Sequence, residues 1–318
     1  VLSLPYGRAF ANRGMQVEEI KVPYKEYLTY CRVVNPGGKK TPLLLLHGGP
    51  GSTHNSFELF DSFAFSSDRP VVMYDQIGCG LSSIPDDKPE LYCSDTWIDE
   101  LQNLIAFLHL DDFYLLGHSW GGMLAQLYCL KTGSKGVKSL ILSSTLSSAS
   151  LWKEETHRLI RSMSKEDQRT IREAEEKNDY TAPEFQEALD HYLKMTVSDY
   201  SKDDPTVPEC LRRKKNPGSV AYNAAWGPSE FQPLGNLKDY EITSQLKEIR
   251  LPVLLLFGEK DESTKRVNQA MYDALTNASK EMIEIPKTRH MTYFENSECY
   301  FEVLSRFLEH NECREKTR

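Results

Sequence analysis

The stretch Phe113-Tyr114-Leu115-Leu116-Gly117-His118-Ser119-Trp120-Gly121 decides how the rest of this chain is interpreted. A short apolar run leads into the pattern G-x-S-x-G, and a helical pattern follows it from Met123 to Leu130. A serine on a tight turn between a strand and a helix exposes its hydroxyl, and small neighbours let the chains approach closely enough to form that turn. The sequence therefore predicts that Ser119 is an exposed nucleophile.

Apolar runs of strand length alternate with helical patterns on both sides of this motif. Continuous apolar runs are typical of strands that are buried on both faces of a parallel sheet. Strands are predicted at 16–22, 27–34, 42–46, 71–74, 113–116, 137–142, 251–257 and 282–285, and helices at 94–108, 120–130, 265–275 and 299–308. This alternation predicts an α/β fold with a mostly parallel, doubly wound sheet.

The alternation is interrupted near Ser144. Residues 151–240 contain no convincing buried strand, and charged helical stretches at 153–163 and 165–177 are followed by several prolines and glycines. These signals indicate a helical insertion of about 100 residues. We therefore expect a core made of residues 1–145 and 246–318, with residues 146–245 forming a helical cap.

Composition and charge exclude several classes of partner. The 318 residues carry a formal net charge of −8, which argues against a nucleic-acid partner or an anionic membrane surface. No apolar run is long enough to span a bilayer. Residues 1–10 lack a basic region followed by an apolar stretch, so no signal peptide is expected. The seven cysteines show no C-x-x-C spacing, which predicts free thiols and a cytoplasmic protein.

A serine nucleophile needs a base, and the base needs an acid to orient it. When the serine lies on a turn of this kind, the acid and then the histidine follow it along the chain. The segment directly after the predicted strand 251–257 contains Glu259, Asp261 and Glu262. Asp261 is the expected acid, and the two glutamates remain alternatives that the sequence does not exclude.

Two of the eight histidines, His290 and His310, follow Asp261. His310 belongs to the end of the terminal helical pattern, where solvent is expected to surround it. His290 lies between the last predicted strand and the last predicted helix, where a catalytic loop is expected. We therefore predict that His290 is the general base and later the general acid that protonates the leaving amine.

The oxyanion that forms during acyl transfer needs two N–H donors in fixed positions. One donor is expected from Trp120, the residue after the nucleophile, and the other from the loop after the strand 42–46. That loop reads His47-Gly48-Gly49-Pro50-Gly51, and Gly49 is the expected donor. His47 precedes the nucleophile in the chain, so we expect it to orient this loop by hydrogen bonding.

Three motifs together resemble the proline iminopeptidases, or prolyl aminopeptidases, of the α/β-hydrolase superfamily. They are His47 to Gly51, Asp75-Gln76-Ile77-Gly78-Cys79-Gly80-Leu81-Ser82, and Gly117 to Gly122. The resemblance extends from about Tyr27 to the last predicted helix. It implies an α/β-hydrolase core with an inserted helical cap and the release of one N-terminal residue, preferentially proline, through an acyl-enzyme. It also implies small peptide substrates with a free N-terminus and no metal or other cofactor.

The resemblance also implies residues that hold the substrate. Gly227-Pro228-Ser229-Glu230-Phe231 matches the cap segment that carries an acid for the substrate's ammonium, so Glu230 takes this role. Glu262, directly after Asp261, is the implied second acid. A buried ammonium does need a carboxylate partner. Trp120, Trp226 and Phe231 are candidate aromatic walls for a proline ring, although each is also a plausible packing residue.

Two alternatives to an exopeptidase stay open at this point. An amino-acid amidase or an esterase with a broader preference for the N-terminal residue would use the same serine, acid and histidine. A binding protein that kept the fold and lost the chemistry is disfavoured, because all three reactive residues are present. The sequence sets neither the preferred peptide length nor the oligomeric state.

Overall fold

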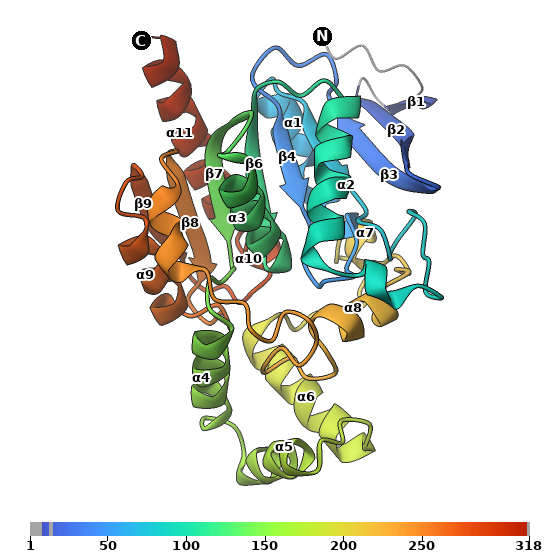
Figure 1. The fold of residues 1–318 in the computed structure, drawn as a ribbon, viewed down its shortest axis with the longest axis vertical. Coiled ribbons are helices and arrows are strands. Elements are labelled where there is room, and N and C mark those ends of the chain that lie inside the picture. The colour runs from blue at the N-terminus through green and yellow to red at the C-terminus, as the bar shows by residue number, and fades with distance from the viewer. Residues whose placement is uncertain (1–7, 13–14, 317–318) are drawn as a thin grey trace.

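A computed structural model describes residues 8–12 and 15–316 of the chain. Its described strands form one nine-stranded sheet in the order β1-β2-β3-β5-β4-β6-β7-β8-β9 (Figure 1). The strand bounds are β1 Arg8–Asn12, β2 Met15–Tyr24, β3 Tyr27–Val34, β4 Leu43–Leu46, β5 Val71–Tyr74, β6 Phe113–His118, β7 Val137–Ser143, β8 Val253–Gly258 and β9 Lys280–Ile285. The expected mostly parallel sheet is confirmed, because β5, β4, β6, β7, β8 and β9 pair in parallel.

The antiparallel part of the sheet lies at one edge. There β1, β2 and β3 form a meander, and β3 pairs antiparallel with β5. The central strand β4 lies between β5 and β6, so the chain leaves it toward opposite sides of the sheet. Ligand sites of open α/β sheets form at such a reversal, outside the carboxyl ends of the strands. The loops that follow β4 and β6 meet there.

Alternate residues of the buried strands serve the two faces of the sheet, as the pleat requires. In β4, Leu44 and Leu46 belong to the hydrophobic cluster that includes residues of α2 (Ser94–Phe107), α3 (Trp120–Thr132) and α9 (Lys265–Ala274). Leu43 and Leu45 belong to the cluster on the other face, with residues of α1 (Asp61–Ser66) and α11 (Ser297–Lys316). Both faces are therefore covered, which explains why β4 consists of four leucines.

The helices around the sheet follow the predicted pattern in most places. Their bounds are α1 Asp61–Ser66, α2 Ser94–Phe107, α3 Trp120–Thr132, α9 Lys265–Ala274, α10 Thr292–Glu295 and α11 Ser297–Lys316, with short 3-10 helices η1 Asn55–Phe60, η2 Pro89–Leu91 and η3 Thr243–Glu248. In the described part of the chain, no helix is both long and apolar enough to cross a membrane.

The described segment between β7 and β8 has no strand and contains five α-helices, followed by η3: α4 Ala149–Ile160, α5 Lys165–Lys177, α6 Pro183–Thr196, α7 Glu209–Arg212 and α8 Ser219–Ala225. Helices α4, α5 and α6 extend away from the sheet, at the end of the molecule opposite β1 (Figure 1). They enclose a small hydrophobic cluster of their own around Phe185 and Tyr192. The limits 146 and 245 of a separate cap stay a prediction.

Some boundaries and elements differ from the sequence expectations. The first cap helix begins at Ala149 and ends at Ile160, whereas the charged pattern suggested residues 153–163, because Ser148 accepts the N–H of Leu151 and caps the helix earlier. Strand β1 was not predicted, since a short edge strand carries little periodic signal. The expectation about the N-terminal segment 1–10 concerns residues that mostly lie outside the described part of the chain.

Candidate active site

The serine turn has the geometry that its glycines predict. Ser119 follows β6 with φ 56° and ψ −122°, and α3 begins at the next residue. A side chain at Gly117 would put Cβ 2.1 Å from the carbonyl oxygen of Gly121, and one at Gly121 would put Cβ 1.9 Å from that of Leu46. A non-glycine residue at positive φ costs about 1–3 kcal/mol, which the surrounding structure must offset.

Two contacts hold the backbone of Ser119 in this conformation. Its N–H donates to the carbonyl oxygen of Ser143 at 2.9 Å, and its own carbonyl accepts from the Thr145 hydroxyl at 2.6 Å. Both partners lie at or just beyond the carboxyl end of β7, the strand next to β6. The turn is therefore fixed by the sheet, and the N–H groups of Trp120 and Gly121, the first two residues of α3, have no partners within that helix.

The structure brings His290 and Asp261 together from two loops. Asp261 follows β8, and His290 lies between β9 and α10. The Nδ1 atom of His290 is 2.7 Å from Oδ1 of Asp261, and both side chains are buried. Because β8 and β9 are parallel neighbours, the loops after them reach the same edge of the sheet.

The carboxylate of Asp261 is fixed by three further donors. Its Oδ1 also accepts the N–H of Ser263 at 2.8 Å, and its Oδ2 accepts the Ser144 hydroxyl at 2.6 Å and the N–H of Gly258 at 3.1 Å. A carboxylate with this many donors has one orientation. It therefore holds the imidazole with Nδ1 toward the acid and Nε2 toward the cavity.

The two other candidate acids have different surroundings. Glu259 accepts the backbone N–H of Lys287 at 2.8 Å, which ties two loops together. Glu262 lies on the other side of the imidazole, with Oε1 3.9 Å from Nε2 of His290. Of the three acids, Asp261 is the one that contacts Nδ1.

Several of the expected site residues line one cavity of about 290 Å³. They come from separate parts of the chain: the loop after β4, the serine turn, the cap, and the loops after β8 and β9. The lining includes Gly49, Ser119, Glu230, Glu262 and His290. The serine, the histidine and both implied ammonium-binding acids thus line the same cavity.

The expected oxyanion loop is held by a network around Gln76. The Gln76 side chain donates to the carbonyl oxygen of His47 at 3.0 Å and accepts the indole N–H of Trp120 at 2.8 Å. Its backbone N–H donates to Nε2 of His47, also at 3.0 Å. Gln76 therefore joins the loop after β4 to the first residue of α3, which are the two sources of the expected oxyanion donors.

His47 has the loop-orienting contacts that the sequence suggested. Its Nδ1 lies 2.9 Å from the carbonyl oxygen of Gly48 and its Nε2 accepts from Gln76, so the ring carries its proton on Nδ1. Burial lowers the pKa of His47 to about 4, which keeps the ring neutral near pH 7. The following glycine, Gly49, has φ 112°, and a Cβ there would lie 2.6 Å from the nitrogen of Gly51.

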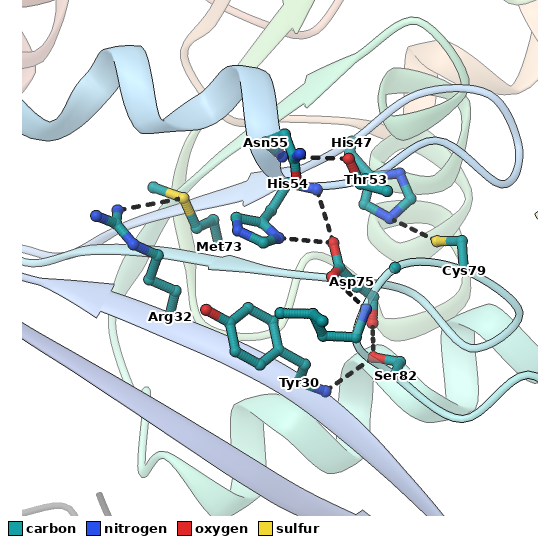
Figure 2. Close-up of polar contacts among 12 residues, drawn as sticks. Tyr30, Arg32, His47, Thr53, His54, Asn55, Met73, Asp75, Cys79 and Ser82 are labelled. Atoms are coloured by element: carbon teal, nitrogen blue, oxygen red, sulfur yellow. Dashed lines mark hydrogen bonds and ion pairs between the residues drawn. The ribbon is translucent and has the colours of Figure 1, made fainter. Parts of the chain in front are cut away.

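Asp75 organises the neighbouring loop from the end of β5. Figure 2 shows its carboxylate between the His54 ring and the loop that contains Ser82. Oδ1 lies 2.8 Å from Nδ1 of His54, and Oδ2 accepts the N–H of Leu81 at 2.9 Å. Burial opposes a charge on His54, but its hydrogen bonds to Asp75 and Glu58 raise its pKa to about 9. An imidazolium is thus buried beside the oxyanion loop at neutral pH.

The two glutamates of the cavity form an acidic pair in which Glu262 is buried and Glu230 is partly buried. Glu230 accepts the hydroxyl of Tyr222 at 2.7 Å, whereas Oε2 of Glu262 is buried with no hydrogen-bond partner among the described residues. Burial raises the pKa of Glu230. Burial and the charges of Glu230 and Asp261 hold the pKa of Glu262 well above its usual range. An unpartnered carboxylate oxygen in a cavity can accept from a cationic ligand.

Comparisons with known proteins agree with this arrangement. A family model described as the alpha/beta hydrolase fold matches residues 41–297. The chain is 45% identical to a proline iminopeptidase of Lactobacillus acidophilus over 298 residues, which cover 94% of this chain and 100% of that protein. It is 46% identical to one of Clostridioides difficile over 300 residues, with the same two coverages. The chain belongs to the proline iminopeptidase family of α/β hydrolases.

Solved structures of related proteins share this architecture. The crystal structure of proline iminopeptidase from Mycobacterium smegmatis has a TM-score of 0.80 and 27% identity, and covers 93% of this chain and 99% of that one. The crystal structure of VinJ also has a TM-score of 0.80, with 28% identity and coverages of 92% and 98%. The likeness therefore includes the helices between β7 and β8 as well as the sheet.

The aromatic candidates of this proline iminopeptidase-family chain are all buried. Trp226 packs at a right angle against Trp152, with 6.0 Å between the ring centroids. Phe231 packs in the same way against Tyr192, at 4.8 Å. The indole of Trp120 bonds to Gln76. A wall of the substrate pocket built from Trp226 and Phe231 stays a prediction.

Sequence reasoning missed the residues that support the site from outside the catalytic set. Gln76 and Asp75 belong to a quoted motif, but nothing in the sequence shows what their side chains contact. His54 follows the oxyanion loop without a recognisable pattern, and no sequence pattern pairs Tyr222 with Glu230, eight residues further along the chain. In residues 8–12 and 15–316, no group of three or more His, Cys, Asp or Glu side chains is arranged to hold a metal ion.

Proposed function

We propose that this chain is a serine exopeptidase that releases an N-terminal residue, preferentially proline, from small peptides through an acyl-enzyme. The observation that carries the proposal is one cavity of about 290 Å³ lined by Ser119, His290, Glu230 and Glu262. A nucleophile beside a paired, buried set of acids suits a substrate whose scissile carbonyl lies close to a free ammonium. Relatives at 44–47% identity that are named proline iminopeptidases support the same activity.

The chemistry assigns one role to each reactive group. Nε2 of His290 removes the proton of Ser119 as the hydroxyl oxygen attacks the scissile carbonyl carbon, while Asp261 stabilises the imidazolium that forms. The carbonyl oxygen becomes an oxyanion that accepts the N–H groups of Gly49 and Trp120. The carbon–nitrogen bond then breaks, and His290 gives its proton to the leaving amine. Water attacks the acyl-enzyme by the same route and regenerates the serine.

The acidic pair determines that a single residue is removed. The ammonium of the substrate binds Glu230 and Glu262, since a charged amine leaves water only for a charged partner. Because this anchor lines the same cavity as Ser119, the proposal places one residue between the N-terminus and the scissile bond. The anchor therefore replaces the side-chain pocket with which an endopeptidase selects its cleavage site.

Residues 146–245 act as a cap over this cavity, and the protein works in the cytoplasm. Cap residues Tyr222 and Glu230 line the cavity together with Ser119, which supports the first statement. Six described cysteines are free thiols, which supports a reducing compartment: Cys31, Cys79, Cys93, Cys129, Cys210 and Cys299.

One panel of substrates tests the proposal. Wild type should cleave prolyl-p-nitroanilide, cleave N-acetylprolyl-p-nitroanilide at least 100-fold more slowly, and act weakly on a simple ester. The variant Ser119→Ala should lose turnover and labelling by a fluorophosphonate, while the exposed Ser162→Ala should keep both. Rapid hydrolysis of the ester with no preference for a free amine would show that the protein is an esterase and not an exopeptidase. Full activity of Ser119→Ala would show that Ser119 is not the nucleophile.

A further inference from the structure

One cation of the cavity has no role in the chemistry above. Lys215 lies in the cap between α7 and α8 and lines the same cavity as Ser119 and His290. It is the one lysine or arginine among the described residues that form this lining. The other basic side chains there are histidines, and burial lowers the pKa of His47 to about 4 and holds that of His118 well below its usual range. Lys215 is therefore the one lysine or arginine cation in the described lining of the cavity.

The ammonium of Lys215 has no carboxylate of its own. Within the part of the chain that the structure describes, it forms no ion pair, whereas its neighbour Arg213 binds both Glu58 and Glu209. Burial lowers the pKa of Lys215, and the like charge of Lys202 lowers it further. A half-exposed cation that faces a cavity without a partner is a site for an anionic ligand.

The backbone around Lys215 is fixed against the oxyanion loop. The guanidinium of Arg213 binds Glu58, the carbonyl oxygen of Asn216 accepts the N–H of Gly80 at 2.8 Å, and the N–H of Gly218 donates to the carbonyl oxygen of Gly51 at 2.7 Å. The segment that carries Lys215 is therefore docked on the core and does not depend on the position of α4, α5 and α6.

The acids of the cavity act on the catalytic histidine. Glu262 lies beside His290, with 3.9 Å between Oε1 and Nε2, and the charge of His290 also acts on Glu230. The charge of Lys215 acts instead on His47, in the oxyanion loop. The cavity thus has an acidic side near His290 and a basic side near the loop after β4, with Ser119 in its lining.

The size of the cavity limits the peptide that can fill it. A volume of about 290 Å³ is at the lower end for small-ligand sites. An extended chain advances about 3.3–3.6 Å per residue, so in a dipeptide or tripeptide the terminal carboxylate lies within one or two residues of the scissile bond. If that carboxylate is buried with the substrate, it needs a cationic partner.

We propose that Lys215 binds the C-terminal carboxylate of a dipeptide or tripeptide whose N-terminal ammonium is held by Glu230 and Glu262. This proposal rests on the exopeptidase function and adds its substrate class: short zwitterionic peptides with a free carboxylate. The acidic pair sets which bond is cleaved, and Lys215 sets how much peptide follows that bond. Longer peptides lose the second contact, because their carboxylate lies beyond the reach of the lysine.

The test compares two substrates that differ only in the terminal charge, prolyl-alanine and prolyl-alaninamide. Wild type should prefer the acid, with a ratio of kcat/KM values of about 10 to 100, the range expected for a hydrogen bond between charged groups. Lys215→Met should bring this ratio close to one, and Lys215→Arg should restore most of it. The matched control is Lys214→Met, because Lys214 is the exposed neighbour and should leave the ratio unchanged.

The outcomes separate this proposal from the exopeptidase function. If the acid-to-amide ratio is the same in wild type and Lys215→Met, Lys215 does not bind the carboxylate, although the exopeptidase function stands. If wild type cleaves neither substrate, the exopeptidase function itself fails. A series from prolyl-alanine to prolyl-pentaalanine adds a second readout: the effect of Lys215→Met should be largest for the two shortest peptides. An effect that is independent of length would also overturn the proposal.

Discussion

The residues expected to perform the chemistry and those expected to hold the substrate are supported in different ways. Ser119, Asp261 and His290 each follow a strand of the mostly parallel sheet, and backbone or hydroxyl groups at neighbouring strand ends fix Ser119 and Asp261. The backbone N–H of His290 donates to the carbonyl oxygen of Thr196, the last residue of α6, at 2.9 Å. Glu230 and Lys215 lie outside the regular helices of the cap, and side chains or short loop contacts hold them. The sheet therefore places the nucleophile and its acid, and we expect the cap to govern chiefly which substrate stays bound. Variants in the two regions should affect different kinetic constants.

The largest expected effect is that of Asp261→Asn on the reactivity side. Both oxygens of Asp261 accept N–H or O–H donors, so the amide of asparagine must turn a donor toward Gly258, Ser144 or His290. His290 then loses the acceptor that orients Nδ1–H, and kcat should fall about 10⁴-fold with little change in KM. Steady-state kinetics with prolyl-p-nitroanilide measure this split. Equal losses in Glu259→Gln, the matched neighbouring acid, would point to a different orienting residue.

The next largest effect is expected from Glu230→Gln in the cap. Removing one charge from a buried ammonium site costs about 2–5 kcal/mol, so kcat/KM for prolyl-p-nitroanilide should fall roughly 30- to 5000-fold, chiefly through KM. The exposed acid Glu173 on α5 provides the control Glu173→Gln, which should behave as wild type. A loss that appears in kcat alone would mean that Glu230 acts on the chemical step and not on substrate binding.

Gln76→Ala tests a residue of the core that touches neither substrate nor nucleophile. Its side chain joins His47 to Trp120, so its loss should let the two expected oxyanion donors move apart. Deleting an oxyanion donor typically lowers kcat by about 10²–10³-fold, and displacing a donor should lower kcat less. We therefore expect Gln76→Ala to lower kcat by about 10- to 100-fold at nearly constant KM. Gln269→Ala, which removes an exposed bond to Asp273, is the control. Gln269→Ala should keep the wild-type kcat. A change of Gln76→Ala in KM alone would exclude the positioning role.

The same division explains how much could be predicted from the sequence. The serine turn, the sheet and the candidates Asp261 and His290 follow from local patterns, because each directly follows an apolar strand and parallel strand ends meet at one edge. Contacts such as Gln76 with Trp120 or Glu58 with Arg213 join residues 44 and 155 positions apart. No local period encodes such pairs. The acids of the cavity were reached only through a resemblance, since irregular cap segments carry no geometric rule.

A smaller effect is expected for the pH dependence of ligand binding. Binding of an ammonium requires ionised acids, and burial raises the pKa of both Glu230 and Glu262, so affinity should increase as the pH rises through these raised values. The hydroxyl of Tyr222 lowers the pKa of Glu230. Tyr222→Phe should therefore move the acidic limb to higher pH by about one unit, the equivalent of one hydrogen bond.

Calorimetric titration of prolinamide into Ser119→Ala, with and without Tyr222→Phe, measures this shift without turnover. Affinity at a pH below the limb should be about tenfold weaker in the double variant. The control is Tyr27→Phe, because Tyr27 lies on β3, far from the acidic pair. An acidic limb that moved to lower pH in the Tyr222→Phe background would contradict the assigned direction of the hydrogen bond.

The smallest expected effect concerns the joint between the two regions. Arg213 of the cap makes a two-pronged contact with Glu58 of the core at 2.7 and 2.8 Å, and its side chain is 38% exposed. Solvent screening limits the value of such a pair, so Arg213→Met should lower the free energy of unfolding by about 1 kcal/mol. Denaturant unfolding measures this free energy. The control Arg266→Met breaks the more exposed pair with Glu154 and should lower the free energy of unfolding by less.

The pH dependence of this loss identifies its cause. Burial opposes the charge on Glu58, but its bonds to His54 and Arg213 lower its pKa to about 2. A carboxyl with a lowered pKa stabilises the fold above its unfolded value of about 4.3, and that stabilisation is lost as the pH falls through the folded value. The gap between wild type and Arg213→Met should therefore be constant above pH 5 and narrow below pH 4. A gap that did not change with pH would mean that Arg213 joins cap and core by packing of its aliphatic stem and not by its charge.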